Sequence, residues 1–221
     1  GTVYLDNIYF FNSNTGRKTI GLYSESTHEA NSDYVINSHG GNPVVAQDSA
    51  EVTPADGSMS LEIDWQSIND PNPGWGGATV DLVESVDVSS YTNLVVAINR
   101  NNLPVGFDIE AENPVGDMHI KLEGAGGAGQ IFLSDFDGGV TVTGDWATLR
   151  IPLSSFAGLD MTAVQKIGFW SPETTIATGT QNTTGKMYFD NIYVEGPVNP
   201  LPEVTEPTAS VDYLFTSDSS N

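Results

Sequence analysis

The sequence has no cysteine and few basic residues, and both shortages narrow what the protein can be. Without cysteine, thiolate catalysis and cysteine-ligated zinc are excluded. Only 7 lysines and arginines stand against 29 aspartates and glutamates, which gives a formal net charge of −22. A surface this acidic repels nucleic acid and anionic membranes and disfavours strongly sulfated polymers. We therefore expect neutral partners or divalent cations, and no nucleic acid or membrane partner.

Long apolar runs are also missing, since no stretch of 18 apolar residues occurs and no membrane-spanning helix is predicted. No signal peptide is recognisable. What the chain does have is 38% hydrophobic and 10% aromatic residues over 221 positions. This composition argues against disorder and is sufficient for a buried core. The sequence therefore predicts a folded chain of one large or two small domains.

Short segments of alternating apolar and polar residues fill most of the chain, and helical periodicity is nearly absent. Each segment has one apolar face, such as Leu61, Ile63 and Trp65 in one segment or Ile167 and Phe169 in another. Such strands predict an all-β fold, an antiparallel β-sandwich or jelly roll. The predicted strands are 19–24, 58–65, 78–82, 93–99, 106–112, 118–123, 147–152, 166–170 and 186–194.

The strongest internal signal is a repeated strand. The first ten residues, GTVYLDNIYF, recur as GKMYFDNIYV at 185–194, with seven of ten positions matching when Leu and Phe count as similar. One interpretation makes residues 1–16 the terminal strand of a preceding repeat and 17–196 a full module. The alternative places both strands in one sandwich, as symmetry-related edges.

Proline marks the end of the predicted module. Residues 197–210 carry four prolines among Glu and Thr, which is typical of a semi-rigid, solvated linker. Residues 211–221 then either begin a further module or form a tail. Because the first residue already lies in a strand-like segment, we expect a fragment of a larger, exported protein whose signal lies upstream.

Several segments together resemble a known family of binding modules. In chain order they are GLYSESTH at 21–28, PADGSMSL at 54–61, GWGG at 74–77, DWATLRIPLSSF at 145–156, KIGFWSP at 166–172 and YFDNIYV at 188–194. They resemble the jelly-roll carbohydrate-binding modules appended to marine bacterial polysaccharide hydrolases, within the superfamily of galactose-binding-like β-sandwiches. The resemblance implies a secreted, non-catalytic module that holds an attached catalytic domain on a laminarin-like β-glucan or a related algal polysaccharide. No motif identifies the sugar.

The resemblance also implies a structural calcium ion where the first strand meets the last. The matching positions are Glu25 in the opening strand, Asp56 in the following turn and Asp190 in the closing strand. Carboxylate oxygens are the ligands that calcium prefers. A carboxylate within the apolar segment around Asp190 is costly unless it has a partner. The alternative is that Asp190 points to solvent or caps a turn.

Neutral sugars are recognised by aromatic faces that stack on their C–H surfaces. Trp75 lies in a Gly/Pro-rich loop, and Trp170 alternates out of phase with the core residues of its strand, so both are predicted stacking platforms. Trp146 and Trp65 are predicted to pack in the core. Tyr34, in a predicted long Asn/Ser-rich loop, is a further candidate for binding.

Polar side chains on the middle strands form a second part of the predicted binding site. If these strands are neighbours, they make one polar, partly charge-paired face; an ordinary solvated face would show the same pattern. The residues are Asn99, Arg100, Asp108, Glu110, His119 and Lys121.

Two other classes of function remain open. A glycosidase needs two carboxylates, and Asp108 and Glu110, two residues apart, share one face of a predicted strand. Acidic residues are so abundant in this sequence, however, that such a pair is expected by chance. No phosphate loop, nucleophile elbow or HExxH motif occurs. The alternatives to a binding module are thus a polysaccharide-cleaving jelly roll and an adhesin or surface-array repeat.

Overall fold

The computed structural model describes residues 17–25, 33–40, 44–65, 76–103, 117–133, 139–176, 179–182 and 185–198. Most of these residues lie in strands, and a 3₁₀ turn spans Leu153–Ser155. No helix in this part of the chain is long and apolar enough to cross a membrane. The predicted boundary segments 1–16 and 199–221, and the predicted strand 106–112, lie outside the described residues, so the domain boundaries stay predictions.

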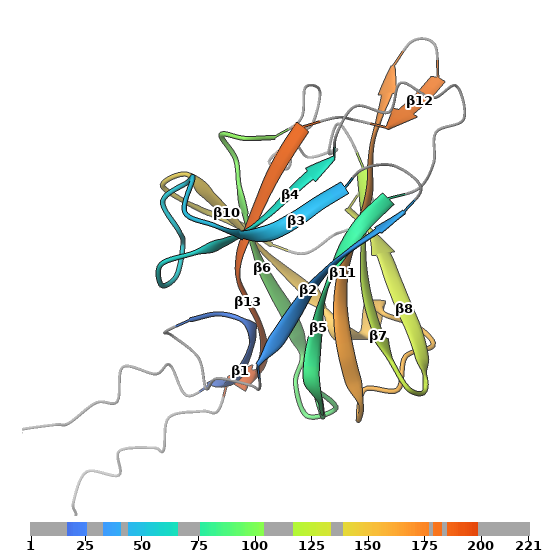
Figure 1. Ribbon diagram of the computed structural model, residues 1–221. Helices are drawn as coiled ribbons and strands as arrows, with labels where there is room; N and C mark the ends of the chain where they lie inside the picture. The colour runs from blue at the N-terminus through green and yellow to red at the C-terminus, as the bar shows by residue number, and fades with distance from the viewer. Residues whose placement is uncertain are drawn as a thin grey trace, which may run out of the picture. The chain divides into compact units, whose positions relative to one another are not determined.

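The strands form two sheets that face each other, as Figure 1 shows. One, called the seven-stranded sheet, has the order β3-β4-β13-β6-β10-β9, with β1 also pairing with β13. Its strands are β1 (Arg17–Tyr23), β3 (Val44–Ser49), β4 (Ser60–Trp65), β6 (Asn93–Asn99), β9 (Val140–Thr143), β10 (Trp146–Pro152) and β13 (Gly185–Val198). The pairs of β13 with β4 and β6, and of β10 with β6 and β9, are antiparallel.

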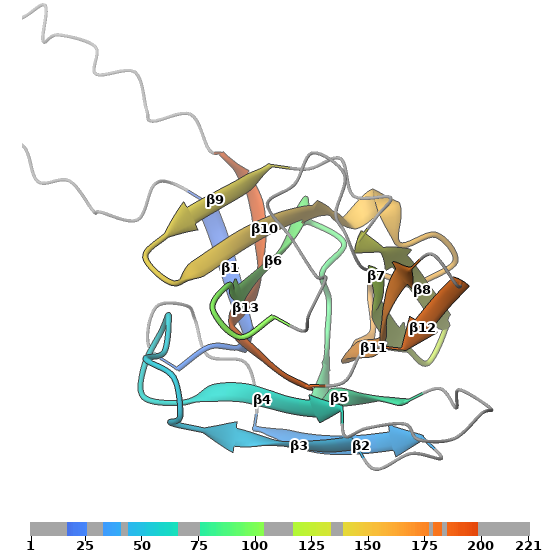
Figure 2. The same cartoon turned by 90° about the horizontal axis from the view of Figure 1, so that it is seen from above.

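The second sheet, called the six-stranded sheet, has the order β2-β5-β11-β7-β8, with β12 pairing with β11. Its strands are β2 (Tyr34–Gly40), β5 (Gly76–Val86), β7 (Asp117–Gly124), β8 (Gly127–Phe132), β11 (Val164–Ile176) and β12 (Gly179–Asn182). Seen from above in Figure 2, β6, β10 and β13 lie on one side of the molecule and β7, β8 and β11 on the other. The antiparallel β-sandwich predicted from the sequence is confirmed.

Apolar residues from both sheets meet between them and make the core. Phe169 of β11 and Phe189 of β13 stack across the interface, with ring centroids 4.1 Å apart and an interplanar angle of 27°. Every described residue that alternation placed on a core face is buried: Leu61, Ile63, Trp65, Leu94, Val96, Ile98, Ile120, Leu122, Ile167 and Phe169. Burying these side chains is the main favourable contribution to folding.

A smaller apolar cluster lies on the other side of the seven-stranded sheet. Trp146, Ala97 and Tyr188 are buried there, with Val52 packed against them. Val52 belongs to the loop that joins β3 to β4, and the Trp146 indole N–H donates to the carbonyl oxygen of Thr53 in the same loop at 3.0 Å. The loop therefore covers part of this sheet, and Trp146 and Trp65 are packing residues, as predicted.

The C-terminal part of β13 is fixed by a buried carboxylate. The Glu195 side chain is 4% exposed, and its Oε1 lies 2.6 Å from an Arg17 guanidinium nitrogen and 3.4 Å from one of Arg150. The amide nitrogen of Asn93 donates to the same oxygen at 3.1 Å. These partners come from β1, β10 and β6, so one carboxylate joins four strands of the seven-stranded sheet.

Replacing Glu195 with Ala should therefore lower the free energy of unfolding by about 2 kcal/mol, because buried charge-assisted hydrogen bonds are lost. Urea unfolding followed by fluorescence measures the change. Glu51→Ala is the control, since Glu51 also pairs with a lysine, Lys186, but is exposed; its midpoint should stay close to that of the wild type. Equal effects of the two substitutions would contradict the role given to Glu195.

Candidate functional site

The face of the six-stranded sheet turned away from the core, called the outer face, carries its side chains in rows across the strands. The strand registers define the first row, which contains four aromatic or imidazole rings and is called the aromatic row: His39, Gly77, Trp170, His119 and Phe132. The next two rows are Asn37, Thr79, Gly168, Lys121 and Gln130, and Val35, Asp81, Lys166, Glu123 and Ala128.

Trp170 lies at the centre of the aromatic row. Its ring centroid is 5.4 Å from that of His39, and the Lys121 ammonium lies over the indole ring, 5.9 Å from its centroid. The ring packs over the backbone of its own sheet, because a Cβ added at Gly77 would meet its Cδ2 and Cε3 atoms at 2.8 and 2.7 Å. Trp170 is partly exposed, so this arrangement leaves indole surface for a ligand.

A second pair of rings continues the row. His119 of β7 and Phe132 of β8 contact each other edge to face, with centroids 4.0 Å apart and an interplanar angle of 63°. Trp170 and Phe132 lie two strands apart, which corresponds to about 10 Å at the usual strand spacing. The row thus offers two aromatic positions across the sheet.

Hydrogen bonds fix the orientation of His39. The Thr79 hydroxyl donates to Asp81 Oδ1 at 2.5 Å, and His39 Nε2 lies 2.9 Å from the same hydroxyl oxygen. Because the hydroxyl has a single proton and gives it to the carboxylate, His39 Nε2 carries a proton and donates to Thr79. Lys166 completes the chain with an ion pair to Asp81 Oδ2 at 2.7 Å.

The charges on this face are paired with one another. Burial acts to raise the pKa of Asp81, but hydrogen bonds from Lys166 and Thr79 outweigh it and lower the pKa below its usual value. Lys121 pairs with Glu123 at 2.9 Å. Two lysines and two carboxylates therefore give this part of the face little net charge. Aromatic faces beside hydroxyl, imidazole and amide groups suit a neutral, hydroxyl-rich ligand.

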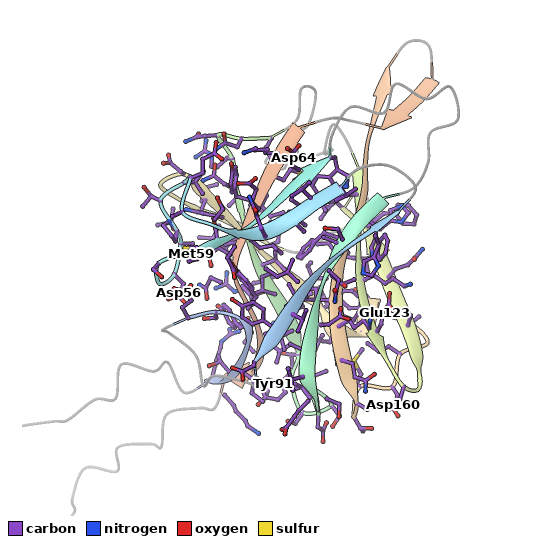
Figure 3. The ribbon with its side chains drawn as sticks, in the orientation of Figure 1. Asp56, Met59, Asp64, Tyr91, Glu123 and Asp160 are labelled. Carbon is purple, nitrogen blue, oxygen red and sulfur yellow. The ribbon has the colours of Figure 1, made fainter. Side chains whose placement is uncertain are left out.

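Three carboxylates form a separate cluster, called the carboxylate relay, beside the seven-stranded sheet. Asp190 Oδ2 accepts backbone N–H bonds from Ala55 at 2.6 Å and Asp56 at 2.9 Å, and Asp190 Oδ1 accepts from Asn191 at 2.6 Å. Asp56 Oδ2 in turn accepts from the backbone N–H of Glu25 at 2.9 Å. In Figure 3 the labelled Asp56 and Glu123 lie well apart, so the relay and the outer face are distinct regions.

Glu25 closes the relay by accepting hydrogen bonds from the backbone N–H and the hydroxyl of Ser58. Burial raises the pKa of Asp190 to about 6, although the three N–H donors favour its ionised form. Each of the three carboxylates thus caps backbone N–H groups of a neighbouring segment. Asp190 caps a turn, which is one of the alternatives that the sequence left open.

The relay brings together the three residues predicted to bind calcium, but it does not arrange them as a coordination shell. In the part of the chain that the structure describes, no group of three His, Cys, Asp or Glu residues is placed to hold a metal ion. Oxygens that accept several N–H bonds are also poorly available to a cation, which needs six to eight oxygen ligands. As arranged, these residues hold the loop before β4 by hydrogen bonds.

The family of the chain follows from its sequence. A family model described as carbohydrate binding domain 30 matches residues 2–196. The chain belongs to this family. The predictions of a carbohydrate-binding module and of a jelly roll are therefore confirmed, and the prediction that the chain is not itself a catalyst agrees with them. Among curated proteins, none matches the sequence.

Solved structures of carbohydrate-binding modules share the fold. Two structures of a family 30 carbohydrate-binding module superpose with TM-scores of 0.55 and 0.52 at 16% and 15% identity, covering 81% and 89% of this chain and 99% and 95% of theirs. The family 11 module of the cellulosomal cellulase Lic26A-Cel5E of Clostridium thermocellum gives 0.50 at 18% identity, over 81% of this chain and 95% of the other. At such low identity they support the fold alone.

The structure places three of the predicted ligand-binding residues of the module together. Trp170, His119 and Lys121 all lie on the outer face, and Lys121 is charge-paired as expected. Trp75, Asp108 and Glu110 lie outside the described residues, so nothing here places them.

Three other predicted residues of the module lie elsewhere. Asn99 is the last residue of β6 and Arg100 follows it, and β6 belongs to the seven-stranded sheet, so it is not a neighbour of β7. Asn99 is buried and accepts from the Asn101 backbone N–H at 3.1 Å, and the Arg100 backbone N–H donates to the Asp145 carbonyl oxygen at 2.8 Å. Both residues stabilise turns at the end of that sheet, and their prediction as part of the outer face is wrong.

Tyr34 is a packing residue of β2, not a loop residue. Its ring contacts that of Tyr23 with centroids 5.0 Å apart, and it packs against the core. Its hydroxyl donates to Asp48 Oδ1 at 3.4 Å, and burial, with the nearby Asp48, raises its pKa to about 12. Alternation turns Val35, the next residue, to the outer face instead.

His39, Thr79, Asp81 and Phe132 of the outer face were not predicted. β2 contains Asn37 and Gly40 and β8 contains Gly127 and Gly129, residue types that are uncommon in strands, so neither strand was recognised. Alternation of Tyr34 and Ile36 was the available signal for β2. No local signal could show that His39 contacts Trp170, because their contact depends on the pairing of both strands with β5.

Replacing Asp190 with Ala should lower the free energy of unfolding by about 3 kcal/mol, because buried backbone N–H groups lose their acceptor. Urea unfolding in EDTA measures this effect without any contribution from a bound cation. Asp87→Ala is the control, since the exposed Asp87 also accepts from a backbone N–H, that of Ser89; it should change little. A stability of Asp190→Ala equal to the wild type would contradict the capping role.

Proposed function

We propose that the module binds a neutral, laminarin-like β-glucan or a related algal polysaccharide through the outer face. In this proposal it holds an attached polysaccharide-degrading enzyme on that polymer. The observation that carries this proposal is the position of Trp170. Its indole packs over the sheet backbone beside His39 and within 5.9 Å of the Lys121 ammonium, with some surface exposed, as stacking on a sugar ring requires.

The charge of the chain supports a neutral ligand. With a net charge of −22, the chain repels polyanions at long range. On the outer face the lysines do not offer an anion site, because Lys166 and Lys121 are held by Asp81 and Glu123. A neutral polymer requires no change to these pairs, whereas a sulfated or uronic-acid polymer would have to compete with them.

The polar groups around Trp170 support hydroxyl recognition. His39 uses Nε2 to donate to Thr79, so in its neutral form Nδ1 is an acceptor. Gln130 and Asn37 lie in the neighbouring row with amide groups that donate and accept. Trp75, Asp108 and Glu110 remain proposed ligand-binding residues in addition to these.

The extracellular location and the enzyme partner are part of the same proposal. Polysaccharides of this kind are met outside the cell, and the Pro-rich segment 197–210 has the composition of a semi-rigid spacer between modules. A binding module joined to a catalytic domain raises the effective concentration of that domain at the polymer.

Trp170→Ala should abolish the retardation of the protein in native affinity gels that contain laminarin or mixed-linkage β-glucan, because the stacking surface is removed. Val83→Ala is the matched control, since Val83 is 63% exposed on the adjacent strand β5 but lies outside the aromatic row; it should migrate like the wild type. Gels with a sulfated polymer should retard none of the three proteins.

Retardation of Trp170→Ala equal to that of the wild type would contradict the assignment of the site. A wild type that is retarded by none of the neutral polymers, or only by a sulfated one, would contradict the proposed ligand class.

Calcium is a separate proposal, for the region of the carboxylate relay. Its support is that Glu25, Asp56 and Asp190, from three distant segments, are joined there by hydrogen bonds. A bound ion would have to take oxygens that now accept N–H groups, so the relay would rearrange. If calcium binds, EDTA should lower the melting temperature and excess CaCl₂ should restore it, whereas MgCl₂ should not. An unchanged melting temperature would exclude a stabilising calcium ion.

A further inference from the structure

Two glycines lie directly beneath the indole of Trp170. A Cβ added at Gly77 would meet the Cδ2 and Cε3 atoms of the indole at 2.8 and 2.7 Å, and a Cβ added at Gly168 would overlap its Nε1 atom and lie 3.3 Å from Cδ1. These atoms belong to opposite edges of the ring system. Because both edges lie close to the sheet, one whole face of the indole is turned to the backbone.

Backbone conformation does not explain these glycines. Neither Gly77 nor Gly168 has a φ in the left-handed region that favours glycine, and both lie in regular strand pairs. A glycine within a strand loses side-chain packing and conformational entropy. At Gly168 the space that the indole occupies requires glycine, and at Gly77 the indole and the backbone carbonyl of Phe169 both require it.

Gly77 also explains how His39 reaches Trp170. The two residues are in β2 and β11, which lie on either side of β5, so their backbones are about 10 Å apart at the usual strand spacing. Gly77 is the residue between them in the aromatic row. Because it has no side chain, the two rings approach to 5.4 Å above it.

We infer that Gly168 and Gly77 are positioning residues that hold the indole of Trp170 face-down on the sheet, so that its other face is turned away from the sheet, beside His39. This inference rests on the proposed function, and it identifies the residues that determine the orientation of the Trp170 indole. A side chain at Gly168 would raise or turn the ring, and a sugar would then meet an indole edge.

Gly168 is the better position for a test. The three atoms nearest to a Cβ there would all be side-chain atoms, two of Trp170 and Thr79 Cγ2 at 3.2 Å, whereas a Cβ at Gly77 would also overlap the backbone carbonyl of Phe169. Gly168→Ala should therefore move the ring and leave strand pairing intact. Gly139→Ala is the matched control, because a Cβ at Gly139 would meet nothing within 4 Å.

Titration calorimetry with a laminarin oligosaccharide should show an affinity about tenfold weaker for Gly168→Ala, as the loss of one stacked contact implies. Gly139→Ala should bind like the wild type. If Trp170→Ala loses binding but Gly168→Ala binds like the wild type, the positioning inference is wrong and the proposed function stands.

A stability cycle tests the same inference without any ligand. Gly168→Ala should lower the melting temperature of the wild type but not of Trp170→Ala, because the ring that it displaces is then absent. Equal shifts in both backgrounds would overturn the inference. Coupling in this cycle together with unchanged glycan binding by Trp170→Ala would keep the positioning role and refute the proposed function.

Discussion

The pairing of β11 with β5 on one side and β7 on the other determines most of what this molecule presents to its surroundings. Its register turns Ile167 and Phe169 into the core and Lys166, Gly168 and Trp170 to the outer face. The same register brings Gly77 opposite Trp170 and Asp81 opposite Lys166. A shift by one residue would bury a lysine and expose a phenylalanine, so the core that stabilises the fold also fixes the position of the indole.

Buried carboxylates connect strands and loops of the seven-stranded sheet that apolar packing does not connect. Glu195 joins four strands through two arginines and Asn93, and Asp190 caps the loop before β4 through backbone N–H groups. Both are buried in strand β13, whose Met187, Phe189, Ile192 and Val194 side chains pack in the core between the sheets. In a chain with such an excess of acidic residues, these few have structural roles because each meets fixed donors.

The sequence predicted those features that depend on local alternation. β6 was predicted with its observed bounds, and Trp170 was recognised as outward-facing because it is out of phase with Ile167 and Phe169. Features that depend on which strands become neighbours were not accessible. Asn99 was grouped with His119 although β6 and β7 belong to different sheets, and His39 was missed because only the register across β5 brings it to Trp170.

The loop that covers Trp146 and Tyr188 has a consequence for how the module meets a polymer. Of the aromatic side chains that the structure describes on the outward sides of the two sheets, those of the seven-stranded sheet are buried, and the partly exposed ones belong to the aromatic row. If the outer face binds glycan as proposed, this part of the chain offers exposed aromatic surface on one sheet and not on the other. With the proposed site, a single copy would attach to one polysaccharide strand without cross-linking two, and bridging of strands would require several modules in one chain.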